Sequence, residues 1–276
     1  MKSLNFNART VPPDASSARA ASSGVRSYSY SESFYRYIET GSLRSASVVV
    51  PLVIRELSPS SVLDVGCGAG AWLAEYRNQG IADYLGVDGA YVRHGSLLIS
   101  AEHFQSKNVA QPFELGRRFD LVQCLEVGEH LPEASSCTLI ENLVRHGEKV
   151  LFSAATPGQG GENHINEQTH EFWRRLFAKH GYRPFDLFRP MIKGDTEVES
   201  WYRYNMLLFV AETALQTLSP EVLRCGLRDG EAIPAMSSRC FRIRARMVSL
   251  LPMQFVSKIA LAKHRIVLAY RLLRDS

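Results

Sequence analysis

The sequence has few cysteines, no long apolar run and no recognisable secretory leader. Its five cysteines are scattered over 276 residues without a C-x-x-C pair, and an odd, dispersed set argues against a disulfide framework and a zinc cage. No stretch of about 18 uninterrupted apolar residues is present, so no membrane-spanning helix is expected. The N-terminus lacks the apolar segment of a secretory signal. These absences predict a protein of the reducing cytoplasm.

Net charge is also small, but it is unevenly distributed. The formal net charge is +4, while residues 236–276 alone hold nine Lys or Arg and one Asp, so the remainder is mildly acidic. Apolar residues recur at helical spacing from Ile259 to Leu273, which predicts a basic amphipathic helix after a break at Pro252. Such a helix can lie on an anionic membrane surface, bind nucleic acid or a partner subunit, or dock on its own domain. The favoured interpretation is that this helix docks on its own domain.

Strand and helix patterns alternate through the middle of the chain. Strands are predicted at 61–65, 83–88, 103–109, 119–127, 148–154, 182–188 and 203–212, and helices at 70–79, 133–146 and 167–181. Before them we expect a helix at 28–39 and an amphipathic helix at 42–57 that Pro51 should kink or restart. The alternation predicts an α/β fold, with a doubly wound, mostly parallel seven-stranded sheet and helical appendages at both termini. We expect disorder at 1–27, one domain at 28–212 and a basic, largely helical extension at 213–276.

The segment VLDVGCGAGAWL, residues 62–73, is the most informative motif. A short apolar run is followed by glycines at three alternate positions and then by a helix start, which predicts a strand that turns sharply into a helix. The helix N-terminus offers free N–H groups, so a nucleotide-like cofactor is expected on this loop. The dinucleotide pattern G-x-G-x-x-G/A also fits, with Asp88 about 20 residues further on. S-adenosylmethionine is favoured because the glycines alternate, Asp64 precedes them where it can meet an ammonium group, and no second mononucleotide-binding half follows.

With these segments in place, the chain resembles the class I S-adenosylmethionine-dependent methyltransferases over roughly residues 30–212. The resemblance is carried by VLDVGCGAGAWL, YLGVDG, FDLVQCLEVGEHLP and AKHGYRP. A bacterial subgroup looks closer still, and it shares VLFSAATPGQGGENHINEQTHEFW and WYRYNMLLFV. Members of that subgroup are often found alongside polysaccharide or glycosyltransferase functions. The resemblance implies a Rossmann-like methyltransferase fold and the cofactor.

The resemblance also implies which residues bind the cofactor. Asp64 and the glycines would line its methionine end, and Asp88 would accept from both ribose hydroxyls because a carboxylate accepts two bonds in a fork. Asn108 stands where the family usually has an Asp that binds the adenine amino group, and its oxygen can accept the same bond. Leu125 and Glu126 would lie under the sulfonium. The cofactor-binding residues implied are Asp64, Gly66, Cys67, Gly68, Gly70, Asp88, Gly89, Asn108, Leu125 and Glu126.

On the acceptor side, two polar segments follow predicted strands. A hydroxyl acceptor must lose its proton, usually to a His, Asp or Glu. His164, in a loop flanked by glycines, is the first choice for this base, with His130 and Glu129 as further catalytic candidates. A second interpretation assembles Glu126, Glu129 and two histidines around a divalent metal. E-x-x-E-H with a distant His resembles metal-dependent small-RNA 2′-O-methyltransferases and ubiquinone-pathway O-methyltransferases. The metal-free arrangement is favoured, so no metal ligand is predicted.

The sequence therefore predicts methyl transfer from S-adenosylmethionine to an oxygen, on a sugar, a glycan or another small metabolite. Metal-assisted RNA 2′-O-methylation is the first alternative, and the mildly acidic domain argues against it because phosphate contacts govern RNA binding. A cofactor-binding module without turnover, recruited to a membrane, is the second alternative. The expected partners are a small-molecule or glycan acceptor, with peripheral contact of the C-terminal helix at the inner membrane face as an option. No nucleic-acid partner is expected.

Overall fold

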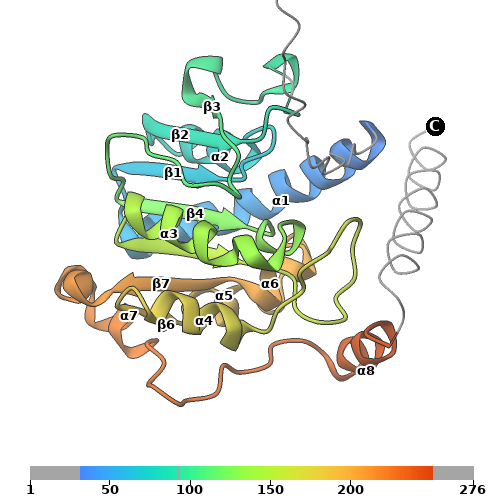
Figure 1. Ribbon diagram of the computed structural model, residues 1–276. Helices are drawn as coiled ribbons and strands as arrows, with labels where there is room; N and C mark the ends of the chain where they lie inside the picture. The colour runs from blue at the N-terminus through green and yellow to red at the C-terminus, as the bar shows by residue number, and fades with distance from the viewer. Residues whose placement is uncertain (1–31, 93, 251–276) are drawn as a thin grey trace, which may run out of the picture.

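The computed structural model of the protein describes residues 32–92 and 94–250, and its centre is one seven-stranded sheet (Figure 1). The strand order is β3-β2-β1-β4-β5-β7-β6, and only β7 runs antiparallel to its neighbours. This order confirms the doubly wound, mostly parallel α/β sheet. The strands are β1 (Ser61–Val65), β2 (Asp83–Asp88), β3 (Phe104–Ser106), β4 (Leu121–Leu125), β5 (Lys149–Ser153), β6 (Tyr182–Phe185) and β7 (Leu207–Ala211).

Helices cover both faces of the sheet. In Figure 1, α3 and α4 lie in front of the sheet, while α1, α5 and α6 lie behind it. The contacts agree, since α1 packs on α2 and α5, and α3 packs on α4. The helices are α1 (Glu32–Leu57), α2 (Ala71–Asn78), α3 (Ser136–His146), α4 (His170–Ala178), α5 (Phe188–Ile192), α6 (Ser200–Asn205), α7 (Pro220–Arg224) and α8 (Arg239–Val248).

The central strands are buried on both faces, which explains their nearly continuous apolar sequences. Every residue of β1, β4 and β7 is buried, as expected for parallel strands covered by helices on two sides. Apart from Ser61 at the start of β1, two polar residues interrupt the pattern, Asp64 in β1 and Gln123 in β4, and they are register partners. Burying a carboxylate in the middle of a sheet is unfavourable for folding. Asp64 is therefore a candidate for ligand binding.

One correction concerns the N-terminal helices. Two helices, with a kink or restart at Pro51, were expected, but α1 runs without a break from Glu32 to Leu57 with Pro51 inside it. A proline inside a helix removes one backbone hydrogen bond and costs about 3 kcal/mol. Here Ala46, Val49, Val50 and Val53 are fully buried in the core on either side of Pro51. Their packing keeps the helix continuous.

Several strand ends also differ from the prediction. The strand expected at 103–109 is only Phe104–Ser106, and the one expected at 119–127 stops at Leu125. It stops there because Glu126 adopts a left-handed backbone with φ of 57°. The strand expected from 203 begins at Leu207, because the preceding residues belong to α6.

The fold brings the C-terminal ends of β1, β2, β4 and β5 to one edge of the sheet, where the predicted motifs lie. No helix within 32–92 and 94–250 is long and apolar enough to cross a bilayer. The predictions of disorder at 1–27 and of an amphipathic helix through Ile259–Leu273 lie outside the described residues.

Candidate active site

The glycine-rich loop connects β1 to α2 and adopts the conformation that its glycines allow. Gly66, Gly68 and Gly70 have φ of 80°, 54° and 87°, which L side chains rarely adopt. A Cβ at Gly66 would lie 2.3 Å from Val127 Cγ2, whereas a Cβ at Gly68 would meet nothing within 4 Å. The loop therefore touches the segment after β4 at one glycine and exposes its main chain to a ligand at the other.

Asp88, the last residue of β2, is tied directly to this loop. Its carboxylate accepts hydrogen bonds from the main-chain N–H of Gly68 at 2.6 Å, from that of Gly89 at 2.6 Å, and from the Tyr91 hydroxyl. Burial raises the pKa of Asp88, and these three donors oppose the rise. The acid thus sits beside the glycine loop with a hydroxyl group already donating to one of its oxygens.

Asp64, in β1, comes just before the same loop. It is 3% exposed, and among the described residues its Oδ2 atom has no hydrogen-bond partner. Burial is the largest cause that raises the pKa of Asp64 to about 7, and the nearby Asp88 carboxylate adds to the rise. A positive group placed beside Asp64 would therefore be strongly favoured.

Asn108 follows β3 at the same edge of the sheet. The main chain joins this segment to β2, since Lys107 N donates to Asp88 O at 2.7 Å. The Asn108 side chain is exposed, and its Oδ1 atom accepts from Ala110 N at 3.1 Å within its own turn. A carbonyl oxygen has two lone pairs, so one acceptor position is left for a further donor.

Glu126 directly follows β4 in the left-handed conformation noted above. Its main-chain N–H donates to Ser153 O at 2.9 Å, which holds the turn against the end of β5. Its carboxylate accepts from Gln159 Nε2 at 2.9 Å and from Asn205 Nδ2 at 3.3 Å. A non-glycine residue with positive φ costs of the order of 1 kcal/mol, and such residues cluster at functional sites.

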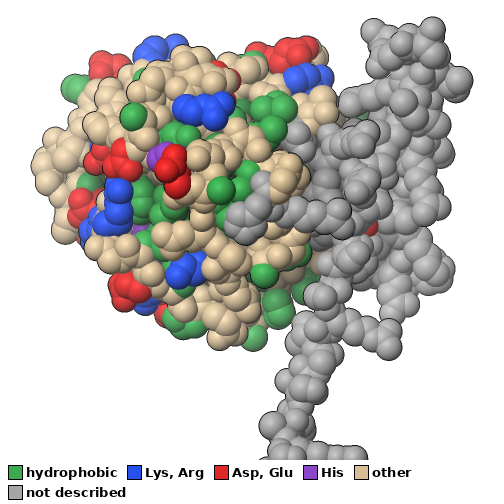
Figure 2. Space-filling view, turned by 90° about the horizontal axis from the view of Figure 1, so that it is seen from above, with side chains coloured by type: hydrophobic (Ala, Val, Ile, Leu, Met, Phe, Trp, Pro, Cys, Tyr) green, Lys and Arg blue, Asp and Glu red, His purple; other side chains and the backbone are tan. Residues whose placement is uncertain are grey.

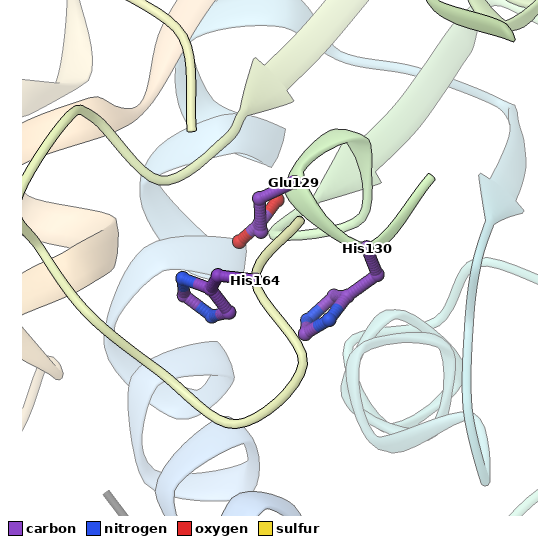
Figure 3. A group of neighbouring side chains, drawn as sticks. All are labelled: Glu129, His130 and His164. Carbon is purple, nitrogen blue, oxygen red and sulfur yellow. The ribbon is translucent and has the colours of Figure 1, made fainter. Parts of the chain in front are cut away.

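Glu129, His130 and His164 come together at the same edge (Figure 3). The two first residues lie on the short turn Gly128–His130 after β4, and His164 lies on the loop after β5. One ligand atom from each lies within 4.8 Å of those of the other two. The Glu129 carbonyl fixes the two segments together, because it accepts from Ile165 N at 2.8 Å and from Asn166 N at 3.0 Å. Two segments 34 positions apart in the sequence thus form one cluster, which we call the acidic-histidine cluster.

The electrostatics of this cluster are unusual. Glu129 is fully buried, and neither of its carboxylate oxygens has a hydrogen-bond partner among the described residues. Burial, followed by the nearby Glu126, raises the pKa of Glu129 well above its usual range. Burial, together with His164, lowers the pKa of His130 to about 3, so His130 is neutral at physiological pH. A carboxylate without donors next to a neutral imidazole is an arrangement suited to a bound cation.

Hydrogen bonds on Nδ1 set the orientation of both rings. Nδ1 of His130 lies 3.2 Å from the Asn163 carbonyl, which can only accept, so the neutral ring carries its lone pair on Nε2. Nδ1 of His164 lies 2.9 Å from Glu167 Oε1. Glu167 also accepts from the main-chain N–H groups of Gly158 and Gly160, at 2.8 and 2.7 Å. One carboxylate thus folds the loop and orients His164.

Three of these supporting residues were missed in the sequence, namely Gln159, Glu167 and Asn205. Gln159 and Glu167 lie in TPGQGGENHINEQ, whose density of polar residues is typical of a loop held by side-chain hydrogen bonds, whereas Asn205 lies outside it at the end of α6. His170, a third histidine close in sequence, does not join the cluster. It begins α4, where burial and then Arg189 lower its pKa to about 4.

The donor set of the cluster fits a divalent cation. Glu129 offers carboxylate oxygen, the two histidines offer imidazole nitrogen, and Glu126 adds a second carboxylate beside them. Mixed oxygen and nitrogen ligands suit Mg, Mn, Fe or Zn. Metal-bound histidines characteristically donate their other N–H to a carboxylate or a carbonyl, as Glu167 and Asn163 allow here.

Comparisons with known proteins point to methyltransferases. Residues 44–178 match the family described as "Methyltransferase domain". The ubiquinone biosynthesis O-methyltransferase of Acinetobacter baumannii (strain ACICU) is 36% identical over an alignment of 109 residues, and the match covers 35% of this chain and 44% of that protein. The enzyme of the same name from Pseudomonas fluorescens (strain SBW25) is 35% identical over 105 residues, 35% of this chain and 45% of that protein. The chain thus matches less than half of the length of these relatives.

A solved structure shows the same fold. The sugar N-methyltransferase KedS8 from Streptoalloteichus sp ATCC 53650 superposes with a TM-score of 0.52 at 17% identity, covering 76% of this chain and 99% of that one. The sheet order and the glycine loop at the end of β1 agree with these matches. Residues 44–178 form a methyltransferase domain, and S-adenosylmethionine is its methyl donor.

Proposed function

We propose that this chain transfers a methyl group to an oxygen atom of a small-molecule acceptor, a sugar or another metabolite. The observation that carries the proposal is the acidic-histidine cluster, in which Glu129, His130 and His164 lie within 4.8 Å of one another. It stands beside the glycine loop, because Gly66 packs against Val127 at the start of the same segment. A hydroxyl acceptor needs a group that removes its proton, and this cluster provides such groups.

The residues that we propose to bind the cofactor lie at the same edge of the sheet. Asp64, with its raised pKa and unpartnered oxygen, would meet the ammonium group of the methionine end. Asp88 would accept from the ribose hydroxyls in place of the Tyr91 hydroxyl, and Gly68 offers an open main chain. Methyl transfer from a sulfonium is an in-line displacement, so the protein mainly supplies alignment and a dry site. We further propose that these residues belong to a domain at 28–212, with 213–276 as an extension.

For proton removal, the geometry favours His164 over His130. Glu167 accepts from His164 Nδ1, which orients the ring and stabilises the positive charge that the ring gains with a proton. His130 is a poor base because its pKa lies near 3, far below physiological pH. Glu129 adds a carboxyl group to the cluster, and Glu126 adds a second one beside it.

A second arrangement of the same cluster uses a divalent cation, and the unpartnered Glu129 carboxylate favours it. Glu129, His130 and His164 would hold the cation, with Glu126 in reach of the same space. A bound cation would act as a Lewis acid on acceptor oxygens and lower the pKa of an acceptor hydroxyl. In both arrangements Glu167 orients His164, and Gln159 and Asn205 hold Glu126.

Two alternatives are less well supported. An RNA acceptor would require a basic surface. On the coloured part of the face seen in Figure 2, Lys and Arg side chains are interspersed with Asp and Glu. A cofactor-binding module without turnover would have no use for a buried carboxylate and two oriented histidines beside the cofactor loop.

The proposal is tested by methyl transfer from radiolabelled S-adenosylmethionine to a panel of hydroxylated sugars and phenols. The full chain is compared with His164→Ala and Glu129→Gln, with and without a chelator, and Mn²⁺ binding is followed separately by electron paramagnetic resonance. We expect both variants to lose transfer while they keep cofactor affinity. Transfer to amines alone, or wild-type rates in both variants, would overturn the proposal. Mn²⁺ binding that depends on Glu129 selects the cation arrangement.

A further inference from the structure

A cavity of about 320 Å³ lies between α8 and the loop that follows β5, outside the cluster described above. Its size is at the lower end of the range for small-ligand sites. The cavity joins two segments that are about 80 residues apart in the sequence. The lining residues with polar or aromatic side chains are Thr156, Ser237, Phe241, Arg242, Arg246 and Ser249.

The helix α8 is seated on the same loop that carries His164. Arg244 Nη2 donates to Gln159 O at 2.7 Å, and the Phe241 ring packs edge-on against Tyr204 at 5.0 Å between centroids. A Cβ at Gly158 would lie 2.0 Å from Ala245 O, so the glycine is what allows the close approach. Because the Gln159 side chain also holds Glu126, the cavity and the acidic-histidine cluster share one loop.

The chemistry of the lining is that of an anion site. Arg242 and Arg246 are four residues apart, so they lie on one face of α8. Both are exposed, and within the described part of the chain no carboxylate forms an ion pair with either. Thr156, Ser237 and Ser249 add hydroxyl groups. Two guanidinium groups with neighbouring hydroxyls can donate several hydrogen bonds to the oxygens of a phosphate. A sugar or an aromatic ring would not need two positive charges.

We propose that this cavity binds a phosphate or diphosphate group of the methyl acceptor. The inference rests on the proposed function, and it narrows the substrate to phosphorylated acceptors, such as a sugar attached to a phosphate. The acceptor would then bridge two sites on one loop, with its anionic end on α8 and its reactive hydroxyl at Glu129 and His164.

The test uses inorganic diphosphate as the probe, titrated into the full chain by calorimetry, so that no turnover is needed. The double variant Arg242→Gln/Arg246→Gln removes both guanidinium groups. Arg239→Gln is the matched control, because Arg239 is exposed on the same helix but does not line the cavity. We expect diphosphate affinity to fall about tenfold or more in the double variant and to change less than about twofold in the control. Unchanged thermal unfolding verifies that both variants fold.

Vesicles of phosphatidylglycerol, compared with phosphatidylcholine, form a second arm that separates a lipid headgroup from a phosphorylated acceptor. Absence of diphosphate binding by the wild-type chain would overturn the proposal. So would diphosphate or vesicle binding that falls equally with Arg239→Gln, since the helix would then act as a general basic surface. Cofactor affinity and methyl transfer are measured independently, so failure here is distinguishable from failure of the proposed function.

Discussion

At the scale of single residues, the main feature of this site is a pair of buried acids that lack hydrogen-bond partners for some of their carboxylate oxygens. Asp64 and Glu129 are both buried, and each has carboxylate oxygens without hydrogen-bond partners among the described residues. Burying such groups costs several kcal/mol when they are charged. Their raised pKa values record that cost. A cationic ligand beside each would offset it, which is why these two acids are the first targets for experiment.

Cofactor binding is expected to release a proton from Asp64. The pKa of Asp64 in the folded protein is about 7, above its usual value of 3.8, so the carboxyl is protonated at pH 6. An ammonium group favours the charged form, so binding of S-adenosylhomocysteine at pH 6 releases close to one proton, and affinity rises with pH up to about 7. Because this pKa is higher in the folded than in the unfolded chain, the contribution of Asp64 to the stability of the free protein falls as the pH rises from about 3.8 to about 7 and then stays constant. Calorimetry in buffers of different ionisation enthalpy measures the release.

The matched variant for this prediction is Asp64→Asn, which keeps the size of the side chain and has no proton to lose. Proton release should disappear and affinity should fall in this variant. The same release in wild type and variant would assign the proton to another group.

Substituting Glu129 should stabilise the protein while it disables the site. Because neither carboxylate oxygen is hydrogen-bonded within the described chain, Glu129→Gln should raise the free energy of unfolding by about 1 kcal/mol at pH 8. Mn²⁺ affinity and methyl transfer should both fall. Thermal unfolding and Mn²⁺ titration are the measurements. A variant that is less stable than wild type would mean that Glu129 has a structural role.

At the scale of elements, strands supply the framework and the turns at their ends supply the chemistry. The strands β1, β2, β4 and β5 end at one edge, and each is followed by a turn with a special backbone or a polar side chain. The loop 154–169 after β5 is the most heavily used. It carries His164, holds Glu126 through Gln159, and supports α8. Its conformation depends on Glu167.

Removing the charge of Glu167 should loosen this loop. Glu167→Gln keeps the shape of the side chain but weakens three hydrogen bonds, to Gly158, Gly160 and His164. Methyl transfer should fall about 10- to 100-fold, as for other residues that orient a catalytic histidine, while cofactor affinity stays the same. Hydrogen exchange at 156–166 should rise. The control is the exposed Glu171 as Glu171→Gln, and equal exchange in both variants would contradict the prediction.

The glycine loop allows a matched pair of alanine substitutions. Gly68 and Gly80 both have positive φ, and a Cβ at either would meet nothing within 4 Å. Each alanine should therefore cost a similar free energy of unfolding, about 1 kcal/mol, from backbone strain. Only Gly68→Ala should lose affinity for S-adenosylhomocysteine, because only that Cβ would stand where the ligand meets the main chain. Equal affinity in the two variants would remove Gly68 from the binding site.

At the scale of the whole molecule, the sheet order separates two tasks. Most of the residues assigned to the cofactor lie on β1 to β3 and the turns after them, and Leu125 and Glu126 at the end of β4 complete that set. The turns after β4 and β5, with α8, carry the residues assigned to the acceptor. The two groups meet between β1 and β4, where the strand order reverses. Open α/β sheets bind ligands at such a switch point, so the topology alone explains why Gly66 touches Val127.

Much of this arrangement was predictable from sequence, because it depends on local patterns. The alternation of apolar segments predicted the sheet, and the glycine spacing predicted the turn after β1. The continuity of α1 through Pro51 was not predictable, since burial of Val50 and Val53 overrides the local cost. The partners of Glu126 were missed because Gln159 and Asn205 lie 33 and 79 residues away. Only the assembled sheet brings them together.

The most direct test of the central claim is calorimetric titration of S-adenosylhomocysteine into the purified full chain, alongside Asp88→Asn. The account predicts one bound ligand per chain and an affinity reduced about tenfold or more in the variant, because one charged oxygen of the fork is replaced by an NH2 group that can only donate. Absence of binding by the wild-type chain, or equal affinity in the variant, would contradict the claim that the cofactor lies on the glycine loop with its ribose on Asp88.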